Sequence, residues 1–138
     1  MAKYTLHPSV IKIIDTLHSE TLKTAVKDFI DYTPIDFTVL SNGALRTPEL
    51  QNSLFKKGYS QLDGYKYKSK HQTGLAVDLV PWVNGKPTWE RDYIMRLSGA
   101  FSAFLKISNI DYINGADWNN DGDLSVDSWD GVHFEVKE

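Results

Sequence analysis

The sequence contains no cysteine, and this absence excludes three kinds of chemistry at once. Disulfide crosslinks, thiolate metal sites and cysteine nucleophiles are all ruled out. Any metal ion that the chain binds must therefore be held by imidazole nitrogen and by oxygen ligands. The sequence offers 4 histidines and 18 acidic residues for that purpose.

Long apolar runs are also absent. No segment reaches the roughly 18 consecutive apolar residues that a membrane-spanning helix needs, so we expect no membrane insertion. The first residues, Met1 to Pro8, carry one lysine with no apolar segment behind it, so we expect no secretory signal. Synthesis in a cytoplasm is therefore expected.

An excess of positive charge is lacking as well. The formal net charge of −3 gives no long-range attraction to nucleic acid, which is not expected as a partner. Lysines nevertheless gather in one segment, at Lys56, Lys57, Lys66, Lys68 and Lys70. Such a cluster is compatible with contact to an anionic polymer and, more commonly, with a solvated loop.

What is present predicts one compact domain of mixed structure. Apolar periodicity predicts helices over residues 8–31 and 88–107, with Trp89 on the inner side of the second and polar residues 18–21 able to split the first. A helix over 47–58 is predicted from its Thr47-Pro48-Glu49 start and its stop at Gly58. Strands are predicted over 35–40, 75–83, 112–113 and 132–136, with a hairpin turn at 84–85 and a loop over 59–73. These elements follow no regular βαβ order, so the predicted fold is α+β, a small antiparallel sheet against two or three helices.

An aspartate stands inside the most apolar predicted strand. Asp78 lies between Val77 and Leu79, and a buried carboxylate is costly unless it is paired, hydrogen-bonded or bound to metal. His71 precedes it in a loop that Gly74 allows to turn sharply. A zinc ion shared by His71 and Asp78 would compensate the buried charge.

A second imidazole stands near the end of the sequence. His133 opens the last predicted strand, and Asp130 precedes it by three residues across a glycine. Two histidines and one carboxylate, with a fourth position left to water, form a known catalytic zinc shell. We therefore predict that His71, Asp78 and His133 hold zinc and that Asp130 lies beside the attacking water.

These motifs resemble those of a known family. The pattern Ser69-x-His71-x-x-Gly74-x-Ala76-x-Asp78, with Asp130-x-x-His133, is similar to the signature of the zinc D-alanyl-D-alanine carboxypeptidases and dipeptidases. Residues 41–51 resemble the segment that carries this family's substrate-binding arginine, here Arg46. Residues 115–118, Gly-Ala-Asp-Trp, resemble an element of its phage endolysin branch, the L-alanyl-D-glutamate peptidases.

The resemblance implies a zinc endolysin that hydrolyses the L-Ala–D-Glu bond of peptidoglycan stem peptides during host lysis. Residues 1–138 would form a single catalytic domain, with the zinc site on the small antiparallel sheet and no separate wall-binding domain. Asp130 would act as the base and Arg46 would face the substrate carboxylate or the oxyanion, while Ser69 and Trp129 would border the substrate. The expected protein is a monomer that reaches the periplasm through a holin-type release.

Two other functions stay open at this point. The same zinc chemistry would serve a D-Ala-D-Ala carboxypeptidase or dipeptidase. A non-catalytic, zinc-bearing and peptidoglycan-binding module of a phage particle is the other alternative. The acid at Asp130 counts against that module, because a domain kept only for binding needs no base beside the metal.

Residues 117–128 resemble a calcium loop. Oxygen-bearing side chains occupy its first, third and fifth positions, with glycine at the sixth, but serine replaces the usual bidentate glutamate at the twelfth. The alternative is an acidic turn that binds no ion. If calcium binds, it would order the chain close to Asp130. The candidate calcium ligands are Asp117, Asn119, Asp121 and Asp123.

Overall fold

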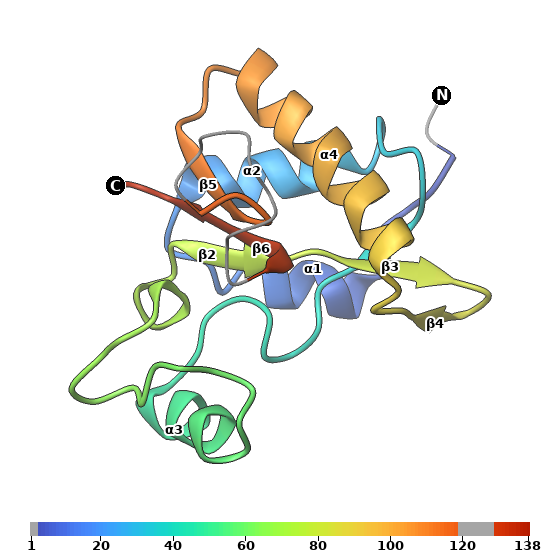
Figure 1. Cartoon of the computed structure of the whole chain (residues 1–138). Coiled ribbons are helices and arrows are strands. Elements are labelled where there is room, and N and C mark those ends of the chain that lie inside the picture. The colour runs from blue at the N-terminus through green and yellow to red at the C-terminus, as the bar shows by residue number, and fades with distance from the viewer. Residues whose placement is uncertain (1–2, 119–128) are drawn as a thin grey trace.

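The computed structural model describes residues 3–118 and 129–138 and has the predicted α+β architecture (Figure 1). Its helices are α1 (Pro8–Ile14), α2 (Glu20–Phe29), α3 (Pro48–Lys56), the short 3-10 helix η1 (Lys70–Thr73) and α4 (Arg91–Ile107). Its strands are β1 (Phe37–Thr38), β2 (Ala76–Asp78), β3 (Val80–Val83), β4 (Lys86–Pro87), β5 (Tyr112–Gly115) and β6 (Asp130–Val136). None of the described helices is long and apolar enough to cross a membrane.

The strands form two small antiparallel sheets, one of which is the predicted sheet that carries Asp78 and His133. One has the order β1-β3-β4 and the other the order β2-β6-β5. The predicted strand over 75–83 is divided because its backbone changes partner around Leu79. The nitrogen of Asp78 donates to the carbonyl of Gly43 at 2.8 Å, and the nitrogen of Leu79 still donates to Val132 of β6 at 2.9 Å. From Val80 onward the chain pairs with β1.

The predicted first helix is split, as its polar stretch over 18–21 suggested, and the break between α1 and α2 lies at residues 15–19. The hydroxyl of Ser19 accepts a hydrogen bond from the nitrogen of Leu22 at 3.0 Å and so begins α2. The nitrogens of His18 and Ser19 both donate to the carbonyl of Gly74, at 3.0 and 3.2 Å. The junction between α1 and α2 therefore holds the end of η1 in place.

Several other predicted boundaries differ from the structure. The last long helix begins only at Arg91, because residues 86–87 pair with β3, and Trp89 is 58% exposed and lies outside the helix. The strand predicted over 35–40 is reduced to β1, whereas β5 and β6 are longer than predicted. The end of the predicted loop forms η1, capped by reciprocal hydrogen bonds between Ser69 and Gln72.

The hydrophobic core fixes which face of β6 is available for chemistry. Phe134 is fully buried and packs edge-on against Phe101 of α4, with ring centroids 4.8 Å apart. Phe29 of α2 joins the same aromatic cluster, 4.9 Å from Phe101. Because side chains alternate along a strand, His133 and Glu135 lie on the opposite face of β6 from Phe134.

Candidate active site

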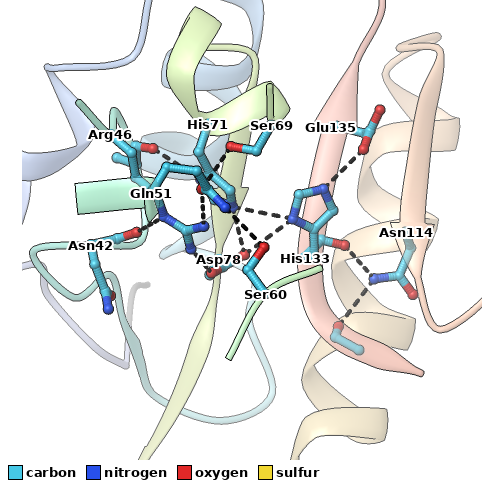
Figure 2. A network of polar contacts seen from close by, with 12 residues as sticks. Asn42, Arg46, Gln51, Ser60, Ser69, His71, Asp78, Asn114, His133 and Glu135 are labelled. Carbon is cyan, nitrogen blue, oxygen red and sulfur yellow. Dashed lines mark hydrogen bonds and ion pairs between the residues drawn. The ribbon is translucent and has the colours of Figure 1, made fainter. Parts of the chain in front are cut away.

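The three predicted metal ligands meet on the sheet β2-β6-β5, although they come from separate parts of the sequence (Figure 2). Asp78 ends β2 and is paired in register with His133 of β6. His71 lies in η1, which leads directly into β2. The prediction that these residues come together is therefore confirmed.

Their ligand atoms form a nearly equilateral triangle. His71 Nε2 lies 3.2 Å from His133 Nδ1 and 3.2 Å from Asp78 Oδ1, and the third side, from His133 Nδ1 to Asp78 Oδ1, is 3.3 Å. Tetrahedral zinc with bonds of 2.0–2.1 Å separates its ligand atoms by about 3.3–3.4 Å. The triangle thus has the size of one face of a zinc coordination tetrahedron.

Hydrogen bonds on the outer side of each imidazole favour one tautomer. His71 Nδ1 lies 2.9 Å from the carbonyl oxygen of Ala44, which only accepts hydrogen bonds, so Nδ1 carries the proton. His133 Nε2 lies 2.9 Å from Glu135 Oε1, which favours the proton on Nε2. Neutral imidazoles in these tautomers direct both remaining lone pairs into the triangle.

Asp78 contributes the third lone pair to this space. Its Oδ1 atom is buried, and the nitrogens 3.2 and 3.3 Å from it are those that His71 and His133 direct into the triangle. Three lone pairs directed at the same point repel one another, so either a proton or a metal cation must lie between the three atoms. The donor set and its geometry therefore fit a zinc ion, which would replace that proton.

Neighbouring charges shift the pKa values of His133 and Asp78 when no metal ion lies between them. Burial favours neutral His133, but hydrogen bonds to Asp78 and Glu135 and the charges of Asp78 and Asp130 raise its pKa to about 9. Burial also opposes ionisation of Asp78, yet the two histidines hold its pKa far below the usual range. A proton on His133 therefore compensates the carboxylate when no metal is bound.

Arg46 is oriented by three hydrogen bonds. Its Nε donates to the carbonyl of Asn42 at 2.6 Å, and its Nη1 donates to Gln51 Oε1 at 3.0 Å. Its Nη2 donates to Asp78 Oδ2 at 3.3 Å, so the guanidinium fixes the carboxylate whose other oxygen faces the histidines. Only 11% of the Arg46 side chain is exposed, and this burial lowers its pKa.

Gln51 is a buried residue of the site that sequence reasoning did not identify. It is fully buried in α3, and its Oε1 accepts from both Arg46 and Ser69, the latter at 2.9 Å. Its amide donates to Ser60 Oγ at 2.8 Å and to the Leu62 carbonyl at 2.9 Å. The only sequence signal was its place at the end of the segment that carries Arg46.

Asp130 begins β6 and lies within electrostatic reach of the triangle. Loss of solvation around its carboxyl raises its pKa, and the charge of Asp78 raises it further, against the opposing charges of His133, His71 and Arg46. The residue nevertheless keeps an exposed surface. Its position is therefore suited to a group that exchanges a proton near Asp78.

The two tryptophans near the site have different surroundings. Trp129, predicted to border the substrate, is partly buried against Val80, Ile94 and Val132, with the Arg91 guanidinium 4.2 Å from its ring. The ring of Trp118 instead lies 5.1 Å from that of His133. Nothing in the sequence assigned Trp118 a role beside the metal ligands, although it belongs to the Gly-Ala-Asp-Trp element.

Asn114 is a second buried polar residue that was not predicted. Its side-chain amide donates to the carbonyls of Gly131 and His133, at 3.0 and 2.9 Å, across a register shift between β5 and β6. Asp117, the first residue of the predicted calcium loop, donates its backbone nitrogen to the Asn114 carbonyl at 2.9 Å. Asn119, Asp121 and Asp123 lie outside the described residues, so calcium binding stays a prediction.

Comparison with known proteins gives consistent relatives. Residues 4–137 match the family described as phage L-alanyl-D-glutamate peptidase. The L-alanyl-D-glutamate peptidase of Escherichia phage T5 is 32% identical over 130 residues, which cover 91% of this chain and 92% of that protein. The crystal structure of the Serratia marcescens L-Ala D-Glu endopeptidase ChiX has the same fold, with a TM-score of 0.76, 24% identity and coverage of 98% of this chain and 91% of that one.

Proposed function

This chain belongs to the phage L-alanyl-D-glutamate peptidase family, and we propose that it is a zinc endolysin that hydrolyses the L-Ala–D-Glu bond of peptidoglycan stem peptides. The triangle of acceptor atoms from His71, Asp78 and His133, with sides of 3.2–3.3 Å, is the observation that supports zinc most strongly. When bound there, zinc supplies a Lewis acid that activates water and polarises the scissile carbonyl.

The acid–base step is assigned to Asp130. Its carboxylate accepts a proton from the attacking water and returns it to the nitrogen of the leaving amine. The raised pKa of Asp130, caused by lost solvation and by the charge of Asp78, favours the first of these transfers because the carboxylate is a stronger base than that of an ordinary aspartate. Its exposed surface leaves the group accessible to a substrate.

Arg46 has two roles in this proposal. It keeps Asp78 Oδ1 directed toward the histidines by binding Oδ2, and its charge would stabilise the carboxylate or the developing oxyanion of a bound substrate. Ser69 acts through Gln51, whose Oε1 it shares with Arg46. Substitution of Ser69 is therefore expected to disturb the orientation of Arg46 more than the chemistry itself.

Glu135 is assigned a positioning role toward His133. The hydrogen bond of 2.9 Å from His133 Nε2 orients the ring and leaves Nδ1 directed at the metal position. A carboxylate that accepts from a metal-binding histidine also raises the basicity of that ligand. His71 has the carbonyl of Ala44 in the corresponding place.

The family match favours the endopeptidase over the D-Ala-D-Ala carboxypeptidase, the dipeptidase and the non-catalytic module. We further propose a monomer that is made in the host cytoplasm and acts on the wall after release through a holin-type pore. Mass spectrometry of digested muropeptides tests the bond. Release of peptides that begin at D-Glu, with L-Ala left on the glycan strand, is expected, stopped by a chelator and restored by zinc, whereas loss of terminal D-Ala alone would contradict the proposal.

A further inference from the structure

A group of exposed tyrosines and lysines lies next to the site and has no role in the chemistry above. Tyr59, Tyr65 and Tyr67 are 78%, 58% and 57% exposed and belong to the segment 59–68, here called the tyrosine–lysine loop. Lys66 and Lys68 of the loop are also exposed. Large exposed aromatic groups with a polar surround are typical of binding surfaces.

Hydrogen bonds from α3 and within the loop hold the backbone of the loop in place. Gln51 and Asn52 of α3 donate to the carbonyls of Leu62 and Asp63, both at 2.9 Å, and the carboxylate of Asp63 accepts from the nitrogens of Tyr65 and Tyr67, at 3.0 and 2.9 Å. The exposed rings are thus presented by an ordered backbone, and little conformational freedom is lost when they bind a partner.

Gly64 makes the close approach of loop and helix possible. Its φ angle is +88°, and a Cβ atom there would lie 2.9 Å from the carbonyl oxygen of Pro48. The carbonyl of Gly64 in turn accepts from the side chain of Gln72 at 2.8 Å, one residue after the metal ligand His71. The loop is therefore attached to η1, beside the site, and Figure 1 shows it with α3 on that side of the molecule.

Charge indicates what kind of partner this surface fits. The chain carries a net charge of −3, yet residues 56–70 contain five lysines and a single acid, Asp63. A stem peptide cleaved before D-Glu carries a free carboxylate close to the scissile bond, because only one of the two carboxyl groups of glutamate continues the chain. The glycan strand adds sugar rings, whose C–H faces pack well on aromatic rings.

We infer that the tyrosine–lysine loop is a second contact with the peptidoglycan strand whose stem peptide occupies the zinc site. Tyr65 and Tyr67 pack against the sugar rings, while Lys66 and Lys68 pair with stem carboxylates. This inference rests on the proposed function. It also explains why Gln51 binds the loop through its amide and Arg46 through its carbonyl, since one buried side chain then aligns both contacts.

Binding of the zinc-loaded Asp130→Asn protein to purified sacculi tests this inference without requiring hydrolysis. Tyr65→Ala combined with Tyr67→Ala should weaken co-sedimentation by roughly 10- to 100-fold, since each ring contributes about a factor of three to ten. Lys66→Ala with Lys68→Ala should weaken it in a salt-dependent manner. Tyr32→Ala, three residues after α2, and Lys106→Ala, in α4, change exposed residues and are matched controls that should bind as before.

Unchanged binding of the tyrosine double variant would overturn the inference. An equal loss of binding to phosphatidylglycerol vesicles would also overturn it, because the contact would then be unspecific electrostatics. In the active protein, the tyrosine variants should raise KM for sacculi and leave hydrolysis of a short soluble stem peptide within about twofold. If the unaltered enzyme cleaves neither substrate, the proposed function fails while the binding result still decides the loop.

Discussion

Zinc binding should be coupled to the loss of one proton from His133. The pKa of about 9 means that His133 is protonated in the metal-free protein near neutral pH. That proton occupies the space between Asp78, His71 and His133 that zinc must fill, and only the neutral imidazole binds metal. Because the pKa is raised, the apparent zinc affinity should increase as the pH rises and level off only as the pH passes through about 9.

The size of this effect follows from the two pKa values. With a pKa of about 9, the neutral fraction of His133 rises about 25-fold between about pH 7 and about pH 8.5. With an ordinary histidine pKa of about 6.5, it would rise less than about twofold. Competition with a chromophoric chelator of known pH dependence measures the difference, and calorimetry in two buffers should give about one proton released per zinc near pH 7.

Glu135→Gln is the matched control for this measurement. It keeps an oxygen acceptor near His133 Nε2 but removes the charge that raises the histidine pKa, so the increase in affinity over the same pH interval should shrink. A change of less than about twofold in the unaltered protein would refute the reasoning. It would mean that the carboxylates do not hold a proton on His133.

Three further substitutions test other parts of the site. Asp130→Asn should retain about one zinc per chain and lose roughly 10²–10⁴-fold in peptide release; near-normal release would assign the proton transfer to another group. Gln51→Ala leaves donors of Arg46 and Ser69 unpaired and should lower the free energy of unfolding in urea by about 2–4 kcal/mol, and a loss under about 1 kcal/mol would contradict that burial. Gly74→Ala should lower the free energy of unfolding by about 2–4 kcal/mol, because φ is +73° and the new Cβ would lie 2.5 Å from His18 Cγ. Gly58→Ala, with φ of +81° and no neighbour within 4 Å, is its control and should cost only about 1–2 kcal/mol; equal losses would exclude the steric contact.

The sequence was sufficient to predict that His71, Asp78 and His133 come together because each had a local physical reason. Asp78 required compensation inside an apolar strand, and His71 and His133 stood in motifs that could supply it. Helix starts were equally local: the Thr47 hydroxyl accepts from the Leu50 nitrogen at 3.1 Å and begins α3, as its sequence indicated. The α+β class followed from the order of these elements.

The residues that orient the ligands could not be found in the same way. Gln51 and Asn114 look like ordinary polar residues until the fold brings them to Ser69 and His133, which are distant in the sequence. The division of the strand at Asp78 likewise depends on the carbonyl of Gly43, a tertiary contact that no periodicity reveals. Such pairings are set by packing between segments, whereas sequence patterns report the preferences of one segment.

Elemental analysis of the purified protein tests the central claim most directly. The account predicts about one zinc per folded chain, and essentially none in a folded His133→Ala variant, with peptide release lost in parallel. Circular dichroism of both proteins confirms that the comparison is between folded chains. A zinc content that is unaffected by His133→Ala, or full hydrolysis by a protein that holds no metal, would contradict the assignment of His71, Asp78 and His133 as the zinc site.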